Sequence, residues 1–506
     1  DRGPARGNLR GSCRSDTPAA VSNVRGTARP GAPRLEGTCA TPKRANQKSR
    51  FVVKQTRKVV IIGAGARGNR VFADLISRHD TGFETAGVVE LDPLRRKAFQ
   101  ERYGIPDERA FAFVEDFLKA PRFGDIVFIC TPDPTHYSLC RAVSERGYDI
   151  LLEKPIATNL PDCLAMLEIE ASSGNRIFVA HVLRYSPFFR TVRRIVQEGT
   201  LGRIRNIRLS ENVGHWHFAH SYVRGSWRRQ DLSAPVILTK SSHDLDILVW
   251  LVGDRVRNVT STGALTYFTS ANAPEGAAAR CVDCRYQDSC LYSATKFYQN
   301  EREEWPFNVT APPPDTLELR RKAVEEGPYG RCVWFNDNDV CDTQTVLMEF
   351  ANGIHATFEL QALTADNTRQ LRVLFDSAEL VGDLHQGKLE ISHFTGRKDE
   401  LRVEPVSIPE VEDSHGGGDL HLLYSLYEHL AVGTEGEVMT SLRSSLPSHA
   451  IAFIAEESRR RRRRLAVPDI FGDEKPKRSR PRTPPVGRRG VRTGPADEPT
   501  TAAASE

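Results

Sequence analysis

A glycine-rich turn between a strand-like run and a helical pattern limits the fold of this chain more than any other feature. Residues 59–62 are Val-Val-Ile-Ile, and they lead directly into Gly63, Gly65 and Gly68, spaced as Gly-x-Gly-x-x-Gly. A helical pattern follows over residues 69–78. In such a unit the first glycine permits the tight turn, the second lets a pyrophosphate approach the backbone, and the third lets the helix pack on the strand. The turn therefore predicts a dinucleotide-binding site.

The pattern changes near residue 180 and predicts two domains. Before it, strand-like and helical runs alternate, which is typical of βαβ units, so residues 55–180 are expected to form a Rossmann domain with a parallel sheet. Beyond it, alternating apolar and polar residues indicate a C-terminal α/β domain over 181–466 with a large, mostly antiparallel open sheet. The expected strands there are 204–211, 257–262, 343–350, 355–363 and 370–375, and the closing helices are 420–429 and 450–459.

The two ends of the chain differ in charge from the middle. Lys and Arg outnumber Asp and Glu by 13 to 3 in residues 1–57 and by 14 to 6 in residues 459–506. Residues 1–54 and 467–506 are expected to be disordered basic segments, although the first also has the composition of an organelle transit peptide. Because the excess charge is confined to the ends, composition argues against a nucleic-acid partner. No apolar run reaches the roughly 18 residues of a membrane helix, so a soluble protein is expected. Ten cysteines in a chain of this length do not indicate a disulfide scaffold, so a reducing, cytoplasmic setting is expected.

A carboxylate is expected near the end of the second strand, where it can bind the adenosine ribose. Asp92 lies 24 residues beyond the last glycine of the turn, near the spacing of roughly 20 that this role requires. It favours NAD over NADP, because a 2′-phosphate would meet like charge. Ala66 and Arg67 complete the phosphate turn, and Arg67, Arg95 or Arg96 could instead neutralise a 2′-phosphate. Asp92 could also simply open the turn that follows it.

Four segments give the chain a resemblance to the Gfo/Idh/MocA oxidoreductases over roughly residues 58–460. They are the glycine turn, Cys130-Thr131-Pro132 with Asp133, Thr135 and His136, Glu153-Lys154-Pro155, and His243-Asp244-Leu245-Asp246. Members of this family combine a Rossmann domain with a C-terminal α/β domain whose open sheet often mediates oligomers. Most oxidise or reduce a carbinol carbon of sugars, inositols or related polyols. The resemblance therefore implies a homo-oligomer that uses NAD, or NADP, on such a substrate.

The same resemblance implies which residues surround the nicotinamide. Thr131, Pro132 and His136 match the family's turn that passes the cofactor ribose. Glu153 and Lys154 belong to the Glu153-Lys154-Pro155 segment of the resemblance. We therefore expect these five residues to contribute to cofactor binding.

The resemblance also implies the acid–base groups. Lys154 matches the family's active-site lysine, which would stabilise a developing alkoxide, and His243 matches its catalytic histidine, whose ordinary pKa near ~6.5 suits a general base. Many members carry an aspartate four residues before that histidine, but here Thr239 stands there, followed by Lys240. The family's set cannot be transferred whole, and Lys240 could assist or bind substrate. Asp246 could orient the imidazole of His243 or pair locally.

Further polar and aromatic residues are candidates for the substrate pocket, since an aromatic face and a fork of donors suit a sugar. They are Arg184, Tyr185, Trp227, Arg228, Asp246 and His415. Core packing is the alternative for Tyr185 and Trp227. The glycines after His415 allow close approach to a ligand, whereas Asp419 could serve only as a helix N-cap.

Residues 270–341 form an insertion rich in Cys, Pro and Asn. Cys281, Cys284 and Cys290 are spaced as a thiolate cluster that Cys332, or Cys341, could complete around a structural zinc ion. Free thiols or a disulfide are the alternatives.

Three functions remain compatible with these patterns. The first is an NAD(P)-dependent oxidoreductase acting on a CH–OH group of a sugar, inositol or related polyol. The second is a glycoside-cleaving enzyme that retains NAD and oxidises a ring carbon transiently before elimination. The third is a dinucleotide-binding sensor, which the presence of Lys154 and His243 disfavours.

Overall fold

The computed structural model describes residues 55–411, 414–432 and 440–471. The basic segments expected at 1–54 and 467–506 lie outside the described residues, apart from residues 467–471. Within the described part of the chain, no helix is both long and apolar enough to cross a membrane.

The first half is built on a six-stranded parallel sheet with the order β3-β2-β1-β4-β5-β6. Its strands are β1 (Arg57–Ile62), β2 (Phe83–Val89), β3 (Ala110–Phe111), β4 (Ile126–Ile129), β5 (Asp149–Leu152) and β6 (Ile177–Val179). Its helices are η1 (Ala66–Ala73), α1 (Asp74–Arg78), α2 (Pro93–Tyr103), η2 (Asp107–Arg109), α3 (Val114–Lys119), η3 (Asp133–Thr135), α4 (His136–Ser144) and α5 (Leu160–Ser173). This order reverses between β1 and β4, where the carboxyl ends of parallel strands leave a crevice for a ligand.

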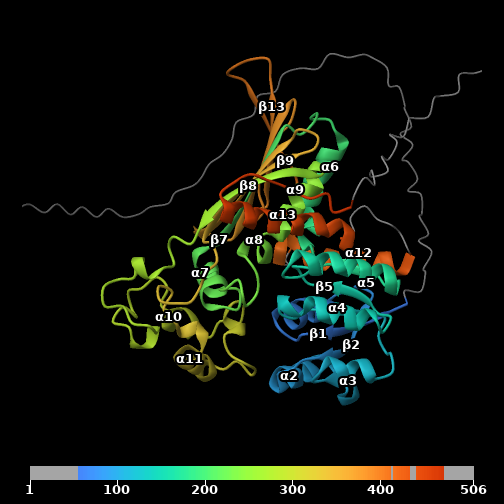
Figure 1. Ribbon diagram of the computed structural model, residues 1–506, viewed down its shortest axis with the longest axis vertical. Coiled ribbons are helices and arrows are strands. Elements are labelled where there is room, and N and C mark those ends of the chain that lie inside the picture. The colour runs from blue at the N-terminus through green and yellow to red at the C-terminus, as the bar shows by residue number, and fades with distance from the viewer. Residues whose placement is uncertain (1–54, 412–413, 433–439, 472–506) are drawn as a thin grey trace, which may run out of the picture. The chain divides into compact units, whose positions relative to one another are not determined.

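Both faces of this sheet are buried, as the continuous apolar run of β1 predicts. Val59 and Ile61 pack in one core, and Val60 and Ile62 pack in another on the opposite face. The first core receives leucines of α12 (Ser414–Val432), whereas the second receives leucines from the start of α13 (Leu442–Arg461). The last helices of the chain therefore return to the Rossmann sheet, as the colours of Figure 1 show.

The second half is built on a nine-stranded sheet with the order β14-β13-β12-β11-β7-β10-β9-β8-β15. Its strands are β7 (Asn206–Gly214), β8 (Val256–Ala264), β9 (Thr343–Phe350), β10 (His355–Thr364), β11 (Thr368–Leu374), β12 (Ala378–Asp383), β13 (Lys388–Phe394), β14 (Leu401–Pro405) and β15 (Leu465–Ala466). β7 and β10 run parallel, and the other neighbouring pairs among the described strands run antiparallel. The predicted fold class, a Rossmann domain followed by a mostly antiparallel α/β domain, is confirmed.

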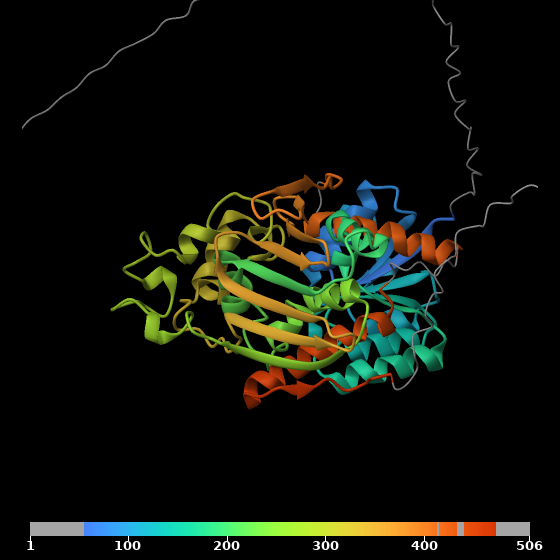
Figure 2. The same cartoon turned by 90° about the horizontal axis from the view of Figure 1, so that it is seen from above.

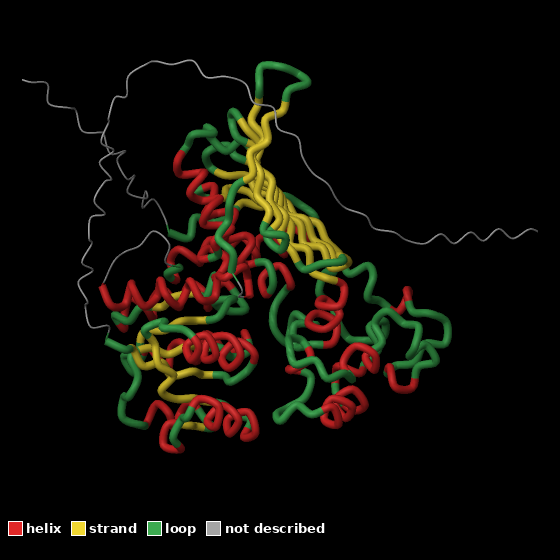
Figure 3. Tube along the Cα trace, turned by 180° about the vertical axis from the view of Figure 1, so that it is seen from behind, coloured by secondary structure: helices red, strands yellow, loops and turns green. Residues whose placement is uncertain are grey.

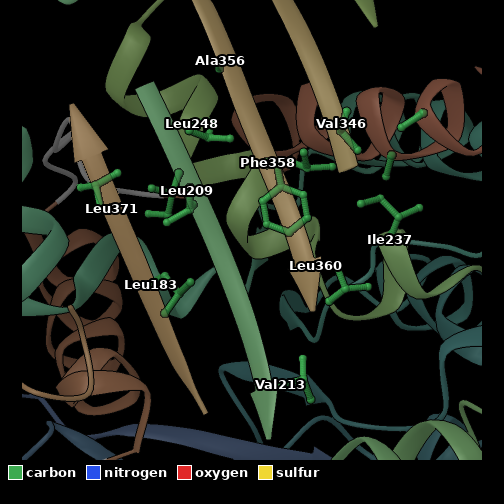
Figure 4. Close-up of a cluster of buried hydrophobic side chains, with 14 of the residues drawn as sticks. Leu183, Leu209, Val213, Ile237, Leu248, Val346, Ala356, Phe358, Leu360 and Leu371 are labelled. Carbon is green, nitrogen blue, oxygen red and sulfur yellow. The ribbon is translucent and has the colours of Figure 1, made fainter. Parts of the chain in front are cut away.

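Helices cover one face of this second sheet and leave the other open (Figures 2 and 3). The remaining helices are η4 (Val182–Tyr185), α6 (Pro187–Glu198), α7 (His215–Phe218), η5 (Ala219–Arg224), α8 (Val236–Thr239), α9 (Ser242–Val252), η6 (Ser270–Asn272), η7 (Cys281–Asp283), α10 (Ala294–Tyr298), η8 (Phe307–Val309), α11 (Leu317–Glu326) and η9 (Pro328–Gly330). Inward residues such as Leu209 and Phe358 pack with Leu248 of α9 (Figure 4). On the opposite face Leu347 and Val381 are exposed.

The insertion carries the cysteines for which zinc was predicted. Cys281, Cys284, Cys290 and Cys332 line one small pocket together with Arg224. Nevertheless, no three His, Cys, Asp or Glu side chains in the described residues are arranged to hold a metal ion. The Arg224 guanidinium lies 3.5 Å from the Cys281 sulfur, so a cation there would meet an existing positive charge. The geometry therefore does not support the predicted zinc site.

Candidate active site

A cleft of about 2170 Å³ lies at the carboxyl ends of the Rossmann strands. Ordinary ligand pockets measure roughly 300–1,000 Å³, so this cleft has room for a dinucleotide together with a substrate. Its walls include the glycine turn, the Glu153-Lys154 segment, α9, the insertion and the start of α12. The described residues of both halves therefore share one site.

Each glycine of the turn is suited to its position for a different steric reason. Gly63 has φ +96°, and a Cβ there would lie 2.7 Å from the carbonyl oxygen of Cys130. A Cβ on Gly68 would lie 2.0 Å from the carbonyl oxygen of Gly63, so this glycine permits the helix to pack. A Cβ on Gly65 would meet no atom within 4 Å, and Gly65 lines the cleft. The space that a side chain would fill at residue 65 is where a pyrophosphate fits, beside the first N–H groups of η1.

The carboxylate at the end of β2 that faces the cleft is Glu90, not Asp92. Asp92 is the N-cap of α2, where its Oδ1 accepts hydrogen bonds from the backbone N–H groups of Leu94 and Arg95, both at 2.9 Å. Glu90 lines the cleft, and its Oε2 accepts a hydrogen bond from the Ala64 N–H at 2.7 Å. Glu90 Oε1 also accepts a hydrogen bond from the Asp92 N–H at 3.0 Å, so both carboxylates hold backbone groups, but only Glu90 lines the cleft. The ribose role of Asp92 therefore stays a prediction, and Glu90 is a second candidate for it.

Arg67 of the turn is held by two buried carboxylates. Its Nε donates to Glu153 Oε1 at 2.5 Å, and its Nη2 donates to Asp419 Oδ1 at 2.7 Å. Arg67 and Glu153 line the cleft, as predicted for cofactor-binding residues, but their charges are already paired. Arg67 therefore ties the phosphate turn to the Glu153-Lys154 segment and to α12.

The turn after β4 also reaches the cleft through two of its three predicted residues. Thr131 and Pro132 line the cleft. His136 is fully buried and does not line it. Its Nδ1 lies 2.7 Å from the carbonyl oxygen of Pro155, and its Nε2 lies 3.0 Å from that of Thr131. His136 therefore fixes the position of the turn instead of contacting a ligand.

Lys154 places its ammonium between the two halves of the site. It lines the cleft, and its Nζ donates a hydrogen bond of 2.5 Å to the carbonyl oxygen of Thr239. Burial, reinforced by the neighbouring Lys240 ammonium, lowers the pKa of Lys154 to about 8. The ammonium is thus largely retained at neutral pH, yet it gives up its proton more easily than an exposed lysine.

His243 lies at the start of α9 and faces the same cleft. It is buried, and its Nδ1 lies 3.4 Å from Nδ1 of His181, a spacing at which one ring donates to the other. Burial, together with the Lys154 ammonium, lowers the pKa of His243 well below its ordinary value. The imidazole is therefore neutral at pH 7 and has a lone pair that can accept a proton.

Lys240 belongs to a charged network in the wall of the cleft. Its Nζ lies 3.0 Å from Glu211 Oε1, and Arg369 lies 2.6 Å from Glu211 Oε2. Arg369 also donates from Nε to Asp244 Oδ1 at 2.7 Å. Although burial favours the neutral carboxyl, Arg369 and Lys240 lower the pKa of Glu211. The network presents charged hydrogen-bonding groups in fixed positions.

The residues predicted to bind substrate separate into two groups. Trp227 and His415 line the cleft. Arg184 and Asp246 are buried in a bidentate ion pair with distances of 2.6 and 2.5 Å, and neither lines the cleft. Asp246 is therefore paired locally and does not orient His243.

The other two candidates also lie outside the cleft lining. The buried Tyr185 hydroxyl lies 3.2 Å from the Thr440 hydroxyl, which fits the core-packing alternative. Arg228 pairs with Asp337 at 2.7 Å. These side chains stabilise the protein around the site without facing a ligand.

Several cleft residues were missed from the sequence. His217 and Trp305 form part of the wall, with ring centroids 4.7 Å apart, and Trp305 is 39% exposed. Glu211 and Arg369 come from strands β7 and β11. The aromatic composition of the insertion was the available signal for Trp305, whereas nothing local marks a buried charge on a strand as functional.

Two family models match the chain. The model described as "Oxidoreductase family, NAD-binding Rossmann fold" matches residues 57–181, and the one described as "Oxidoreductase family, C-terminal alpha/beta domain" matches residues 193–467. Together they cover most of the chain, including both halves of the cleft.

Similar proteins include the protein YteT of Bacillus subtilis (strain 168), which is 25% identical over 393 residues, 73% of this chain and 88% of YteT. The inositol 2-dehydrogenase of Streptomyces avermitilis is 30% identical over 226 residues, 44% of this chain and 60% of that protein. Among solved structures, levoglucosan dehydrogenase with NADH and L-sorbose has a TM-score of 0.60 at 18% identity, covering 82% of this chain and 99% of that one. An oxidoreductase of Agrobacterium radiobacter with NAD+ has a TM-score of 0.58 at 18% identity, covering 81% and 98%.

Proposed function

The chain belongs to the Gfo/Idh/MocA oxidoreductase family, and from this we propose that it oxidises or reduces a carbinol carbon of a sugar, inositol or related polyol. The observation that carries the proposal is one shared cleft. The glycine turn opens into it, and the ammonium of Lys154 and the imidazole of His243 face it. The test is to identify the dinucleotide that the purified protein binds and to screen sugars and polyols for absorbance change of the nicotinamide.

In this proposal the residues of the cleft have separate roles in the reaction. When bound, the nicotinamide supplies the redox chemistry by taking a hydride from the carbinol carbon or returning it to the carbonyl. Lys154 holds the reacting oxygen and stabilises negative charge on it. His243, which is neutral, accepts the hydroxyl proton. Lys240, fixed by Glu211, orients another hydroxyl group of the substrate.

The substrate class rests on the chemistry of the wall and on the relatives. Trp227 and Trp305 are partly exposed in the cleft and offer apolar ring faces to sugar C–H groups. The charged network beside them supplies hydrogen bonds for hydroxyl groups. Several relatives are named inositol 2-dehydrogenase, and one structural neighbour holds L-sorbose. The alternative of glycoside cleavage with retained NAD gains no support from these relatives.

Replacing Trp305 with Ala is expected to raise KM for the substrate about fivefold and to leave kcat within about twofold, because the ring contributes about 1 kcal/mol of contact away from the reacting carbon. Steady-state kinetics with the best substrate of the screen measures this. Phe335→Ala is the matched control, since Phe335 is an exposed aromatic residue of the insertion that does not line the cleft. An unchanged KM in the Trp305 variant would remove the aromatic wall from the substrate site.

Glu90→Gln is expected to weaken NAD+ binding about tenfold and to reduce the preference in affinity for NAD+ over NADP+. The reason is that a charged acceptor for the ribose hydroxyl groups contributes about 1.5–3 kcal/mol. The glutamine retains one acceptor oxygen for the Ala64 N–H but loses the oxygen that accepts from the Asp92 N–H, so the Tm of the apoprotein is measured alongside to detect a change in the turn. Calorimetric titration with each dinucleotide measures the ratio of the two Kd values. In the control, Asp92→Ala should lower Tm through loss of the α2 cap while leaving the ratio unchanged. The reverse pattern would assign the ribose role to Asp92.

We also propose that the chain forms a homo-oligomer through the open face of the nine-stranded sheet. Leu347, Leu363 and Val381 are exposed on strands of this sheet. Packing two such faces together would remove apolar surface from water.

A further inference from the structure

The first turn of α12 has an unusual backbone conformation next to the cleft. His415, Gly416 and Gly417 have φ angles of +52°, +61° and +79°. Glycine adopts this left-handed conformation freely, but a histidine does so only when its surroundings stabilise it. The side chain of His415 lines the cleft. Strained residues of this kind concentrate at functional sites, which makes the contacts of His415 informative.

A buried carboxylate holds this histidine in place. Asp419 Oδ2 lies 2.7 Å from His415 Nδ1, and the Asp419 side chain is fully buried. Its other oxygen accepts a hydrogen bond of 2.7 Å from Arg67. Although burial alone would favour the neutral acid, Arg67 and His415 hold the pKa of Asp419 far below its ordinary value. Asp419 is therefore ionised and acts as an acceptor.

This hydrogen bond decides which ring nitrogen of His415 can react. Because Asp419 accepts at Nδ1, the proton of the neutral imidazole resides on Nδ1 and the lone pair resides on Nε2. A helix cap alone would not require a carboxylate held at both oxygens by a histidine and an arginine. The arrangement is that of an imidazole oriented by an acid, as general bases commonly are.

The position of His415 connects a buried base with water. Its ring centroid lies 6.0 Å from that of His243, a spacing that one water molecule can bridge. His243 is buried, whereas the His415 side chain is 34% exposed. Because His243 is buried, a proton that it accepts needs a second group to carry it to bulk water. Glu211 of β7 also interacts electrostatically with His415.

We propose that His415, oriented by Asp419, relays the substrate hydroxyl proton between His243 and bulk water. The relay rests on the proposed oxidoreductase function. In the oxidation direction the substrate O–H bond breaks as the carbonyl forms, and the C–H hydrogen leaves with both electrons to the bound nicotinamide. The proton moves to His243, then to Nε2 of His415, and then to water or buffer. Both imidazoles end the cycle neutral.

Two variants of His415 separate this relay from a packing role. Gly tolerates the left-handed backbone and leaves room for a free imidazole, and Asn tolerates it while keeping a donor for Asp419. Both variants are expected to lower kcat about 100-fold with little change in KM, since positioned proton transfer contributes about 10²–10⁴. Added imidazole should restore the rate of His415→Gly in proportion to its concentration. His355→Ala is the control, because His355 is an exposed histidine at the start of β10 that does not line the cleft.

The outcomes distinguish the relay from the function on which it rests. If the wild-type protein oxidised no sugar or polyol, both the proposed function and the relay would be ruled out. An active wild type whose His415→Gly variant keeps kcat and changes only KM, or loses kcat without imidazole rescue, would overturn the relay alone. Nitrogen-15 NMR of the imidazoles tests the tautomer without substrate: His415 should carry its proton on Nδ1 in the wild type. A proton on Nε2 would likewise overturn the relay.

Discussion

Lys154→Met is expected to lower kcat about 10³-fold while the Kd for the dinucleotide stays within about threefold. Removing one preorganised donor to a developing oxyanion costs about 10²–10³, and here the donor also carries a full charge. The lost side chain contacts the Thr239 carbonyl oxygen and not the glycine turn, so cofactor binding has no direct reason to weaken. Stopped-flow turnover and a dinucleotide titration measure the two effects separately.

The pH dependence of this variant provides a second measurement. The pKa of Lys154 is lowered to about 8, so the ammonium is present below that pH and disappears as the pH rises through it. Wild-type kcat should therefore fall above about pH 8, and Lys154→Arg should lack this decline because its guanidinium stays charged. Burying an ammonium destabilises the folded state while it is protonated, so Lys154→Met should not lower Tm near pH 7.

Lys119→Ala is the control for the loss of a positive charge, since Lys119 is an exposed lysine of the Rossmann half. It should leave kcat, its pH profile and Tm unchanged. If Lys154→Met retained wild-type turnover, the ammonium would have no part in the reaction.

Gly65→Val should abolish dinucleotide binding, with a Kd weaker by at least about 100-fold, equivalent to about 2.7 kcal/mol. Gly65 has φ −74° and its added Cβ meets no protein atom within 4 Å. The folded apoprotein therefore accepts the valine, whereas a pyrophosphate lying against this backbone does not. Calorimetric titration gives Kd, and differential scanning calorimetry without cofactor gives Tm.

Gly396→Val is the matched control, because Gly396 is also open to solvent and lies in the β13–β14 loop, outside the cleft lining. It should change neither Kd nor Tm. Wild-type affinity in Gly65→Val would show that the dinucleotide does not pass over this turn.

The fold was predictable where a short stretch of sequence determines the local structure. The β-branched run of β1 and the glycine turn act within a dozen residues, and β9 begins and ends where the pattern of residues 343–350 places it. Helix α13 begins earlier than the expected 450, because Ser441 caps it and Pro447 fits inside it. Strands β12 to β14 were missed.

The site was less predictable because its decisive contacts join distant residues. Arg184 and Asp246 are 62 residues apart and Arg67 and Asp419 are 352 apart. A charged residue read in isolation looks equally suited to a ligand or to such a partner. Asp92 is different, since an acidic residue before Pro is also a local signal for a helix N-cap, and Asp92 does cap α2.

The hydrogen bond from Lys154 to the carbonyl oxygen of Thr239 matters when related sequences are compared. The Lys154 ammonium donates its hydrogen bond to a main-chain oxygen, and every amino acid supplies such an oxygen. Residue 239 can thus be Thr, although the family resemblance implies Asp there, and the ammonium still has its hydrogen-bond acceptor. Comparing side-chain identities at this site would miss a retained function, whereas comparing backbone traces would detect it.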